Sequence, residues 1–280
     1  MVPWFPCAAP VFSHVCSSVS SQVRGAAARA TTDVPEGDSI RRAARRLQPL
    51  VGERVEVETP HPRAAAMNLA ARLNGLRLER VDAVGKNVLL HFEGRVTLCS
   101  HLRMKGRWRV TRRGEPLRGT PWLVLRTAEL VASQWNGPIL TLRDDAVRSL
   151  GPDILDQPPD VAAMIARLRG APDLYLAEAL QRQQLVAGIG NMWVAEILWA
   201  NRLSPWLYVR DVSDGGLRSV LKEAHRQMSA ALESPRASRK VYRRAGRGCR
   251  RCGVPIRSQG QGDANRLAYW CPGCQPTSST

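Results

Sequence analysis

Four cysteines near the C-terminal end of the sequence constrain the fold most. Cys249, Cys252, Cys271 and Cys274 form the pattern C-x2-C-x18-C-x2-C. Each C-x2-C turn offers two thiolates to one ion, and this spacing is typical of a tetrahedral zinc site. A pair of disulfide bonds is the alternative, but such frameworks are typical of small secreted scaffolds. The pattern predicts a C-terminal hairpin that holds one structural zinc ion per chain, with all four ligand positions taken by thiolates.

The chain is strongly basic and rich enough in apolar residues to fold. It carries 41 Lys and Arg against 24 Asp and Glu, a net charge of +17, and 44% of its residues are hydrophobic. This hydrophobic content excludes a disordered basic tail protein. No run of 18 apolar residues is present, which argues against a membrane-spanning helix. A folded cationic chain most often binds a polyanion, and we expect nucleic acid rather than a membrane surface.

Changes in composition divide the chain into four segments. Residues 1–33 are rich in Ala, Ser and Val and are interpreted as a disordered extension or as a mis-assigned start. Residues 34–150 open with a helix capped by Asp38 and continue in short alternating runs, which predict a β-sandwich or barrel-like domain. Residues 151–235 are predicted to be helical, and residues 236–280 hold the zinc hairpin. The predicted fold class is therefore α+β.

Two further patterns point to contact with phosphates. Gly188 and Gly190 permit tight turns with positive φ before a helix predicted to begin at Asn191. Backbone N–H groups at such a helix N-terminus, with the Asn191 amide, are a ready phosphate site, although an ordinary helical hairpin with an Asn cap explains the same residues. Between Arg236 and Arg257 lie nine Lys or Arg and no acidic residue. Because this run enters the metal-bound hairpin, its charges would be fixed in space, and we predict that they contact phosphates.

Three blocks, in this order, resemble the formamidopyrimidine-DNA glycosylase and endonuclease VIII family of base-excision enzymes. They are VPEGDSIRRA at 34–43, GIGNMWVAEIL at 188–198 and the cysteine-bearing hairpin at 240–275. The resemblance implies an N-terminal β-sandwich, a helical domain with a helix–two-turns–helix motif, and damaged double-stranded DNA bound between them. It further implies a bifunctional glycosylase and AP lyase that nicks the strand by β,δ-elimination. The amino-acid sequence of the hairpin resembles endonuclease VIII more closely, which implies oxidised pyrimidines as substrates.

The implied chemistry needs an amine that attacks the sugar C1′ and forms an iminium ion. The family uses an N-terminal proline, which corresponds to Pro35, and Glu36 would protonate the departing base or the opened sugar. As written, Pro35 lies inside an amide bond, so its nitrogen has no basic lone pair. We therefore expect translation to begin at codon 34, here Val34, and the initiator to be removed. A helix-opening proline without catalytic function is the alternative.

The resemblance implies further contacts with DNA. Lys86 would contact a phosphate and assist glycosidic cleavage, and it would be the Schiff-base nucleophile if the proline is blocked; an exposed lysine at a strand end is the alternative. Arg266 on the hairpin would hold the phosphate at the flipped nucleotide, and Asn191 would hold the same backbone. Met104, beside Arg103, would fill the gap that the flipped base leaves.

Two positions depart from the family pattern. Ser39 stands where many relatives carry a glutamate, and Lys105 replaces an aromatic residue expected in endonuclease VIII. These departures put the choice of base in doubt. A lesion-binding or DNA-structure-binding protein without catalysis is the main alternative, and a zinc-ribbon protein acting on RNA is a more distant one. We expect no cofactor besides zinc, a monomer, no membrane association, and a location in the bacterial cytoplasm at the nucleoid.

Overall fold

The computed structural model describes residues 35–117, 119–137, 139–142, 145–234 and 239–277. The expected extension at 1–33 and the expected start at Val34 lie outside these residues. Within them, buried side chains form three clusters: one in the β-rich part, one in the helical part and one around the C-terminal cysteines. The domain boundaries at 150 and 235 stay a prediction.

The first element is helix α1 (Gly37–Leu47), which buries Ile40, Ala44 and Leu47 on one face. Its cap is Glu36 and not Asp38, so the predicted cap is wrong by two residues. The Glu36 N–H donates to Ser39 Oγ at 2.9 Å, and the Ser39 hydroxyl donates to the Glu36 carbonyl at 2.8 Å. Ser39 thus bonds back to the cap residue, as a glutamate at the third helical position does in a capping box.

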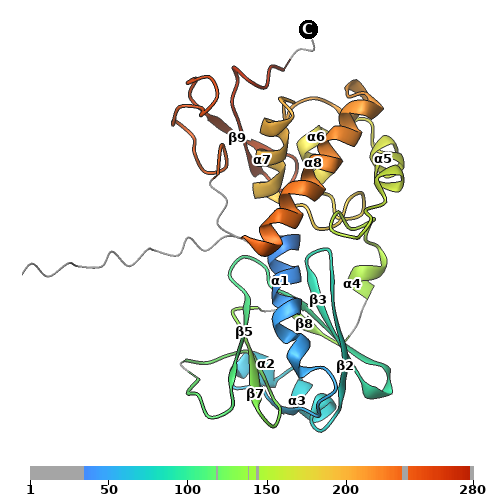
Figure 1. Cartoon of the computed structure of the whole chain (residues 1–280), viewed down its shortest axis with the longest axis vertical. Coiled ribbons are helices and arrows are strands. Elements are labelled where there is room, and N and C mark those ends of the chain that lie inside the picture. The colour runs from blue at the N-terminus through green and yellow to red at the C-terminus, as the bar shows by residue number, and fades with distance from the viewer. Residues whose placement is uncertain (1–34, 118, 138, 143–144, 235–238, 278–280) are drawn as a thin grey trace, which may run out of the picture. The chain divides into compact units, whose positions relative to one another are not determined.

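Two four-stranded antiparallel sheets follow, with the orders β1-β6-β7-β5 and β2-β3-β4-β8. One hydrophobic cluster joins both sheets to α1, which lies beside β2, β3 and β5 (Figure 1). This arrangement confirms the predicted α+β fold with an N-terminal β-sandwich. The strands are β1 (Glu56–Glu58), β2 (Leu78–Val84), β3 (Asn87–Phe92), β4 (Val96–His101), β5 (Arg107–Arg112), β6 (Leu123–Arg126), β7 (Leu130–Trp135) and β8 (Ile139–Thr141).

The run 121–130 is not one continuous strand. Thr127 begins a turn in which its N–H donates to the Leu130 carbonyl at 2.8 Å, so β6 ends and β7 begins within this run. Strand β7 is buried along nearly its whole length and lacks the alternation that marks a half-buried strand. Short helical pieces complete the β-rich part: η1 (Gln48–Leu50), α2 (Pro62–Ala65), α3 (Leu69–Leu73) and η2 (Glu93–Arg95).

The helical part packs around a second cluster of buried side chains. Helix α7 begins at Asn191 as predicted, and helix α8 is the longest, with 20 residues. Helix α8 also contacts α1. The elements are α4 (Asp145–Arg148), α5 (Val161–Arg169), α6 (Leu176–Gln181), α7 (Asn191–Ala200), η3 (Val209–Asp211) and α8 (Asp214–Glu233).

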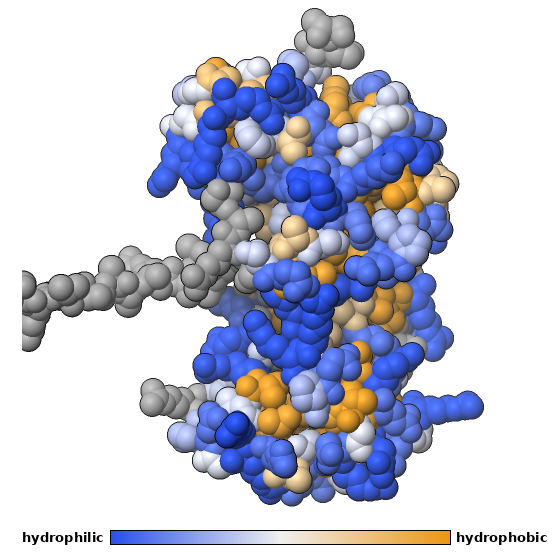
Figure 2. Space-filling model, in the orientation of Figure 1, coloured by the Kyte–Doolittle hydropathy of each residue, from blue (hydrophilic) through white to orange (hydrophobic). Residues whose placement is uncertain are grey.

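Strands β9 (Arg257–Gln261) and β10 (Arg266–Trp270) form the predicted hairpin, and it lies between the two cysteine pairs. The face in Figure 2 is mostly hydrophilic, with smaller hydrophobic areas. Among the described residues, the large hydrophobic side chains that reach solvent are few: Met67, Met104, Val254 and Leu267. No helix of the described ranges is long and apolar enough to cross a membrane.

Candidate active site and metal centre

The segment Pro35-Glu36-Gly37 packs directly against the loop Gly188–Gly190. The Glu36 carboxylate accepts hydrogen bonds from the N–H groups of Met192 at 2.9 Å and Trp193 at 3.3 Å, in the first turn of α7. The Gly37 N–H donates to the Gly188 carbonyl at 2.9 Å. A carboxylate at this position is favoured because the N-terminus of a helix carries a partial positive charge. Two of the motifs found in the sequence therefore form one site.

This contact explains both glycines of the loop. Gly188 has φ +93°, a conformation that side chains rarely adopt. Gly190 has an ordinary φ of −123°, so the predicted positive φ is wrong there. A Cβ atom at Gly190 would lie 2.2 Å from Glu36 Cδ, and this close approach is what requires a glycine. The predicted phosphate site at the start of α7 also needs correction, because Glu36 occupies two of its N–H groups.

Lys86 interacts electrostatically with both Glu36 and Arg266. Burial raises the pKa of Glu36 to about 7, while the Lys86 charge and the N–H groups of Met192 and Trp193 lower it. Burial lowers the pKa of Lys86 to about 8, with the Glu36 charge opposing this effect and the Arg266 charge adding to it. A carboxyl group and an amine whose pKa values both lie near neutrality can donate and hold protons at physiological pH.

Lys86 lies in the two-residue turn that joins β2 to β3, between the paired residues Val84 and Asn87. Its side chain is half-buried. The alternative of an exposed lysine at a strand end does not describe this environment. Lys86 is therefore close enough to Glu36 for their charges to affect each other, and its catalytic role stays a prediction.

Arg266 and Asn191 both lie where the hairpin meets the helical part. The Arg266 guanidinium donates to Gln181 Oε1 at 3.2 Å, and Gln181 is a buried residue of α6. The Asn191 amide donates to the Leu267 carbonyl at 2.9 Å. Asn191 is not the cap of α7, which is Gly190. These two bonds fix the first residues of β10 against the two-turn loop.

Arg103 and Met104 occupy the turn between β4 and β5. Met104 is 59% exposed, and Arg103 has φ +52°. The Arg103 N–H donates to His101 Nδ1 at 3.0 Å, which fixes the start of the turn. Burial, followed by the charges of Arg103 and Lys86, lowers the pKa of His101. The turn therefore presents an apolar tip beside a basic residue.

Pro35 borders a cavity of about 730 Å³. Its walls come from α1, the β4–β5 turn with the start of β5, α7 along its length, the C-terminal half of α8 and residues 239–240. The residues nearest to Pro35 in sequence that line it are Asp38, Ser39 and Arg42. Asp38 is buried and its carboxylate bonds to the indole N–H of Trp193 at 2.9 Å and to Arg42 at 2.7 Å. The cavity wall at Pro35 is therefore held rigidly to α7.

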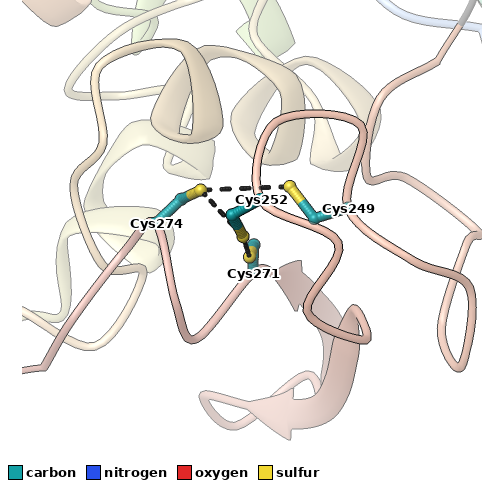
Figure 3. A group of neighbouring side chains, drawn as sticks. All are labelled: Cys249, Cys252, Cys271 and Cys274. Atoms are coloured by element: carbon teal, nitrogen blue, oxygen red, sulfur yellow. Dashed lines mark hydrogen bonds between the residues drawn. The ribbon is translucent and has the colours of Figure 1, made fainter.

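The four cysteines converge on one point (Figure 3). All four sulfurs lie within 4.8 Å of one another, and three of the sulfur pairs are 3.3–3.9 Å apart. A tetrahedral ion with metal–sulfur bonds of about 2.3 Å needs sulfurs about 3.8 Å apart. A disulfide needs about 2.05 Å, so the arrangement fits a metal and not a pair of disulfides.

The surroundings of the cluster also fit a bound ion. The Trp199 indole N–H and the Arg251 N–H each donate to Cys249 Sγ, at 3.3 and 3.4 Å. Such bonds to the ligand atoms stabilise thiolates and orient them. The contact of Trp199 with the cluster is a role that its helical spacing does not reveal.

A further buried carboxylate was missed by the sequence analysis. Glu196, in the middle of α7, accepts N–H bonds from Lys240, Val241 and Tyr242 at 2.8–3.0 Å. It thereby attaches the segment before the cysteines to the helix. A single acidic residue within the otherwise apolar run WVAEILW was the available signal.

Comparison with known proteins supports this architecture. The model of the formamidopyrimidine-DNA glycosylase N-terminal domain matches residues 34–145. Formamidopyrimidine-DNA glycosylase of Lactococcus lactis, solved non-covalently bound to DNA with an AP site, has a TM-score of 0.74 at 23% identity and covers 86% of this chain and 99% of its own. A structure of MutM in complex with DNA that contains carbocyclic 8-oxo-G has a TM-score of 0.73, also at 23% identity. These likenesses define the fold as that of the formamidopyrimidine-DNA glycosylases.

The curated relatives are more similar in sequence. A probable endonuclease 8 2 of Streptomyces coelicolor is 35% identical over 263 residues, with 86% of this chain and 94% of that protein covered. The DNA-(apurinic or apyrimidinic site) lyase Nei2 of Mycolicibacterium smegmatis is 34% identical over 264 residues and is covered completely. The chain belongs to the formamidopyrimidine-DNA glycosylase and endonuclease VIII family, on the endonuclease VIII side.

Proposed function

We propose that this chain is a bifunctional DNA glycosylase and AP lyase of base excision repair, acting on damaged double-stranded DNA. The observation that carries the proposal is the buried Glu36 carboxyl, which directly follows Pro35 in the sequence. Burial raises its pKa to about 7, and the Lys86 charge opposes this rise. The names of the curated relatives, endonuclease 8 and an AP lyase, support the same activity. Oxidised pyrimidines are the proposed substrates, because curated relatives that share about a third of their residues with this chain carry the name endonuclease 8.

In the proposed reaction, the Pro35 nitrogen supplies the nucleophile. Its lone pair forms a bond to C1′, the bond from C1′ to the base breaks, and Glu36 gives a proton to the departing base. The nitrogen then loses its own proton, the C1′–O4′ bond breaks and O4′ takes up a proton, so the sugar ring opens and an iminium ion forms at C1′. This ion acidifies the C2′ proton, and loss of this proton breaks the C3′–O3′ bond and expels the 3′ phosphate. The reaction requires a free Pro35 amine, and the family match, which begins at residue 34, supports a mature chain that starts at Pro35.

The proposed DNA contacts lie around this centre. The Lys86 charge acts on Glu36, and the Arg266 charge acts on Lys86. The Asn191 side chain bonds to the Leu267 carbonyl, next to Arg266 on β10. Met104 would enter the stack at the position of the flipped nucleotide, with Arg103 beside it. The cavity at Pro35 would receive the extruded base, which costs a few kcal/mol of unstacking that the contacts with phosphates offset.

Zinc is the proposed ion at Cys249, Cys252, Cys271 and Cys274. Four thiolates suit zinc and leave no position for a substrate, so the ion would serve only to shape the hairpin that carries Arg266. We further propose that the protein acts as a monomer in the bacterial cytoplasm. Its curated relatives come from bacteria, whose DNA lies in the cytoplasm.

Borohydride trapping on duplex DNA with one abasic site tests the proposal. Residues 1–280 should give no trapped complex through Pro35, because its nitrogen is an amide, whereas a chain that begins at Pro35 should be trapped and should nick the strand. Trapping of both forms would transfer the nucleophile to a lysine, first of all Lys86. Trapping of neither form would overturn the proposed enzymatic activity and would favour a DNA-binding protein without catalysis.

The pH dependence of base excision follows from the two perturbed groups. Glu36 can donate a proton only while protonated, so the single-turnover rate should fall as the pH rises through about 7. The Lys86 charge lowers the pKa of Glu36. In Lys86→Ala the falling limb should therefore move to higher pH, even where the maximal rate is reduced. A falling limb that stays at the same pH in this variant would contradict the electrostatic coupling.

A further inference from the structure

The turn that carries Lys86 has an external support. Gly85, the other residue of the turn, has φ +58°. Its N–H donates to Asp153 Oδ2 at 2.8 Å, across 68 residues of sequence. A Cβ atom at Gly85 would lie 3.1 Å from Leu150 and 3.4 Å from Ala187, so the turn also packs closely against the helical part. The position of the Lys86 backbone is therefore set by contacts outside its own sheet.

Asp153 is itself fixed in the same region. It is only 5% exposed, and its other oxygen, Oδ1, accepts the Leu155 N–H at 2.8 Å. Its neighbours pair with Ala187: the Ala187 N–H donates to Pro152 at 3.0 Å, and the Ile154 N–H donates to Ala187 at 3.1 Å. Ala187 directly precedes Gly188, whose carbonyl accepts the Gly37 N–H.

Arg41 completes the set of contacts. This residue of α1 places Nη2 3.4 Å from Asp153 Oδ2 and 2.8 Å from Asp156 Oδ1. The Asp153 carboxylate thus contacts the Lys86 turn and the helix that follows Glu36, and its backbone pairs with the segment leading into the two-turn loop. Asp156 shares the arginine, but its side chain is 58% exposed and, within the described part of the chain, forms no hydrogen bond with the turn.

We propose that Asp153 is a positioning residue for Lys86, holding the Lys86 turn in place relative to Glu36. The inference rests on the proposed function for its catalytic meaning, but its structural content is independent of activity. Without the Asp153 carboxylate, the Gly85 N–H loses its acceptor and the turn is free to move into solvent. Lys86 would then leave the half-buried environment that lowers its pKa to about 8.

Lysine labelling measures this directly, because the chain has only four lysines: Lys86, Lys105, Lys222 and Lys240. Reductive methylation as a function of pH, read by peptide mass spectrometry, should give a midpoint near pH 8 for Lys86 in the wild type. In Asp153→Ala this midpoint should rise by at least one pH unit, while the other three lysines are unchanged. Asp153→Asn keeps one acceptor oxygen and should give a smaller rise. Asp156→Ala, the matched control, should give none.

The rate of nicking of abasic DNA is the second measurement. It is made with whichever form of the chain, residues 1–280 or the form that begins at Pro35, nicks the strand. Asp153→Ala should lower the single-turnover rate at least tenfold, with DNA affinity changed less than threefold. An unchanged Lys86 midpoint in both Asp153 variants would overturn the inference, as would an equal shift in Asp156→Ala. A change at all four lysines in Asp153→Ala would indicate that this variant unfolds. In that case the Lys86 midpoint of Asp153→Asn decides whether the inference holds. Absence of nicking in the wild type would defeat the proposed function, while the labelling would still decide on Asp153.

Discussion

Glu36→Gln is expected to lower base excision by about 10²–10⁴-fold, the usual contribution of a positioned general acid. The glutamine amide has nearly the same shape and can still accept the Met192 N–H, but it has no proton to give to a departing base. Nicking of an abasic site made beforehand needs no base to depart, so it should fall much less. The ratio of the two rates, measured on the same oligonucleotide under single-turnover conditions, isolates the proton transfer.

The same substitution at Glu233 is a suitable control. Glu233 is 76% exposed and pairs with Arg45 at the surface, so Glu233→Gln should leave both rates unchanged. Equal losses of excision and nicking in Glu36→Gln would show that Glu36 supports the loop at Gly188–Gly190 and is not the acid. The falling limb of the pH profile should also disappear in Glu36→Gln, because the titrating group is gone.

Cys271→Ser is expected to remove the metal and, with it, most of the affinity for DNA. Binding of a structural zinc ion contributes about 10–16 kcal/mol to the folding of small zinc modules, and three of the seven buried residues of the third hydrophobic cluster are Cys249, Cys271 and Cys274. Without the ion, Arg266 and the basic residues before the hairpin lose their fixed positions. Affinity for abasic DNA at constant salt should fall at least tenfold.

Metal analysis of the purified protein decides this prediction. The wild type should contain one zinc ion per chain, and Cys271→Ser should contain none. Cys99→Ser, at a buried cysteine of β4 far along the chain from the cluster, should keep the ion. Stoichiometric zinc or wild-type affinity in Cys271→Ser would contradict the structural assignment of the metal.

The sequence predicted the parts of the site that depend on local patterns. The convergence of the four cysteines, the start of α7 and the hairpin each depend on a few dozen residues, and the structure confirms all three. What the spacing could not predict were contacts between distant segments. The bonds from Glu36 to Met192 and from Asp153 to Gly85 span 156 and 68 residues, and no periodicity reports such a pairing.

Gly190 illustrates the limit well. Its presence in a turn suggested a positive φ, which is the common reason for a glycine there. The actual reason is that a side chain from the other end of the chain needs the space. Ser39 is a similar case: read as the loss of a carboxylate, it makes two hydrogen bonds with Glu36 that a sequence comparison does not reveal.

Helix α7 connects the acid to the metal cluster through four of its residues. Its first turn binds Glu36, Glu196 binds residues 240–242, and Trp199 donates to Cys249 Sγ. At about 1.5 Å and 100° per residue, the ten residues of α7 set both the spacing and the relative rotation of these contacts. Insertion or deletion of a single residue would turn Glu196 and Trp199 away from their partners by more than a quarter of a revolution. The length of this helix is therefore a fixed dimension of the protein.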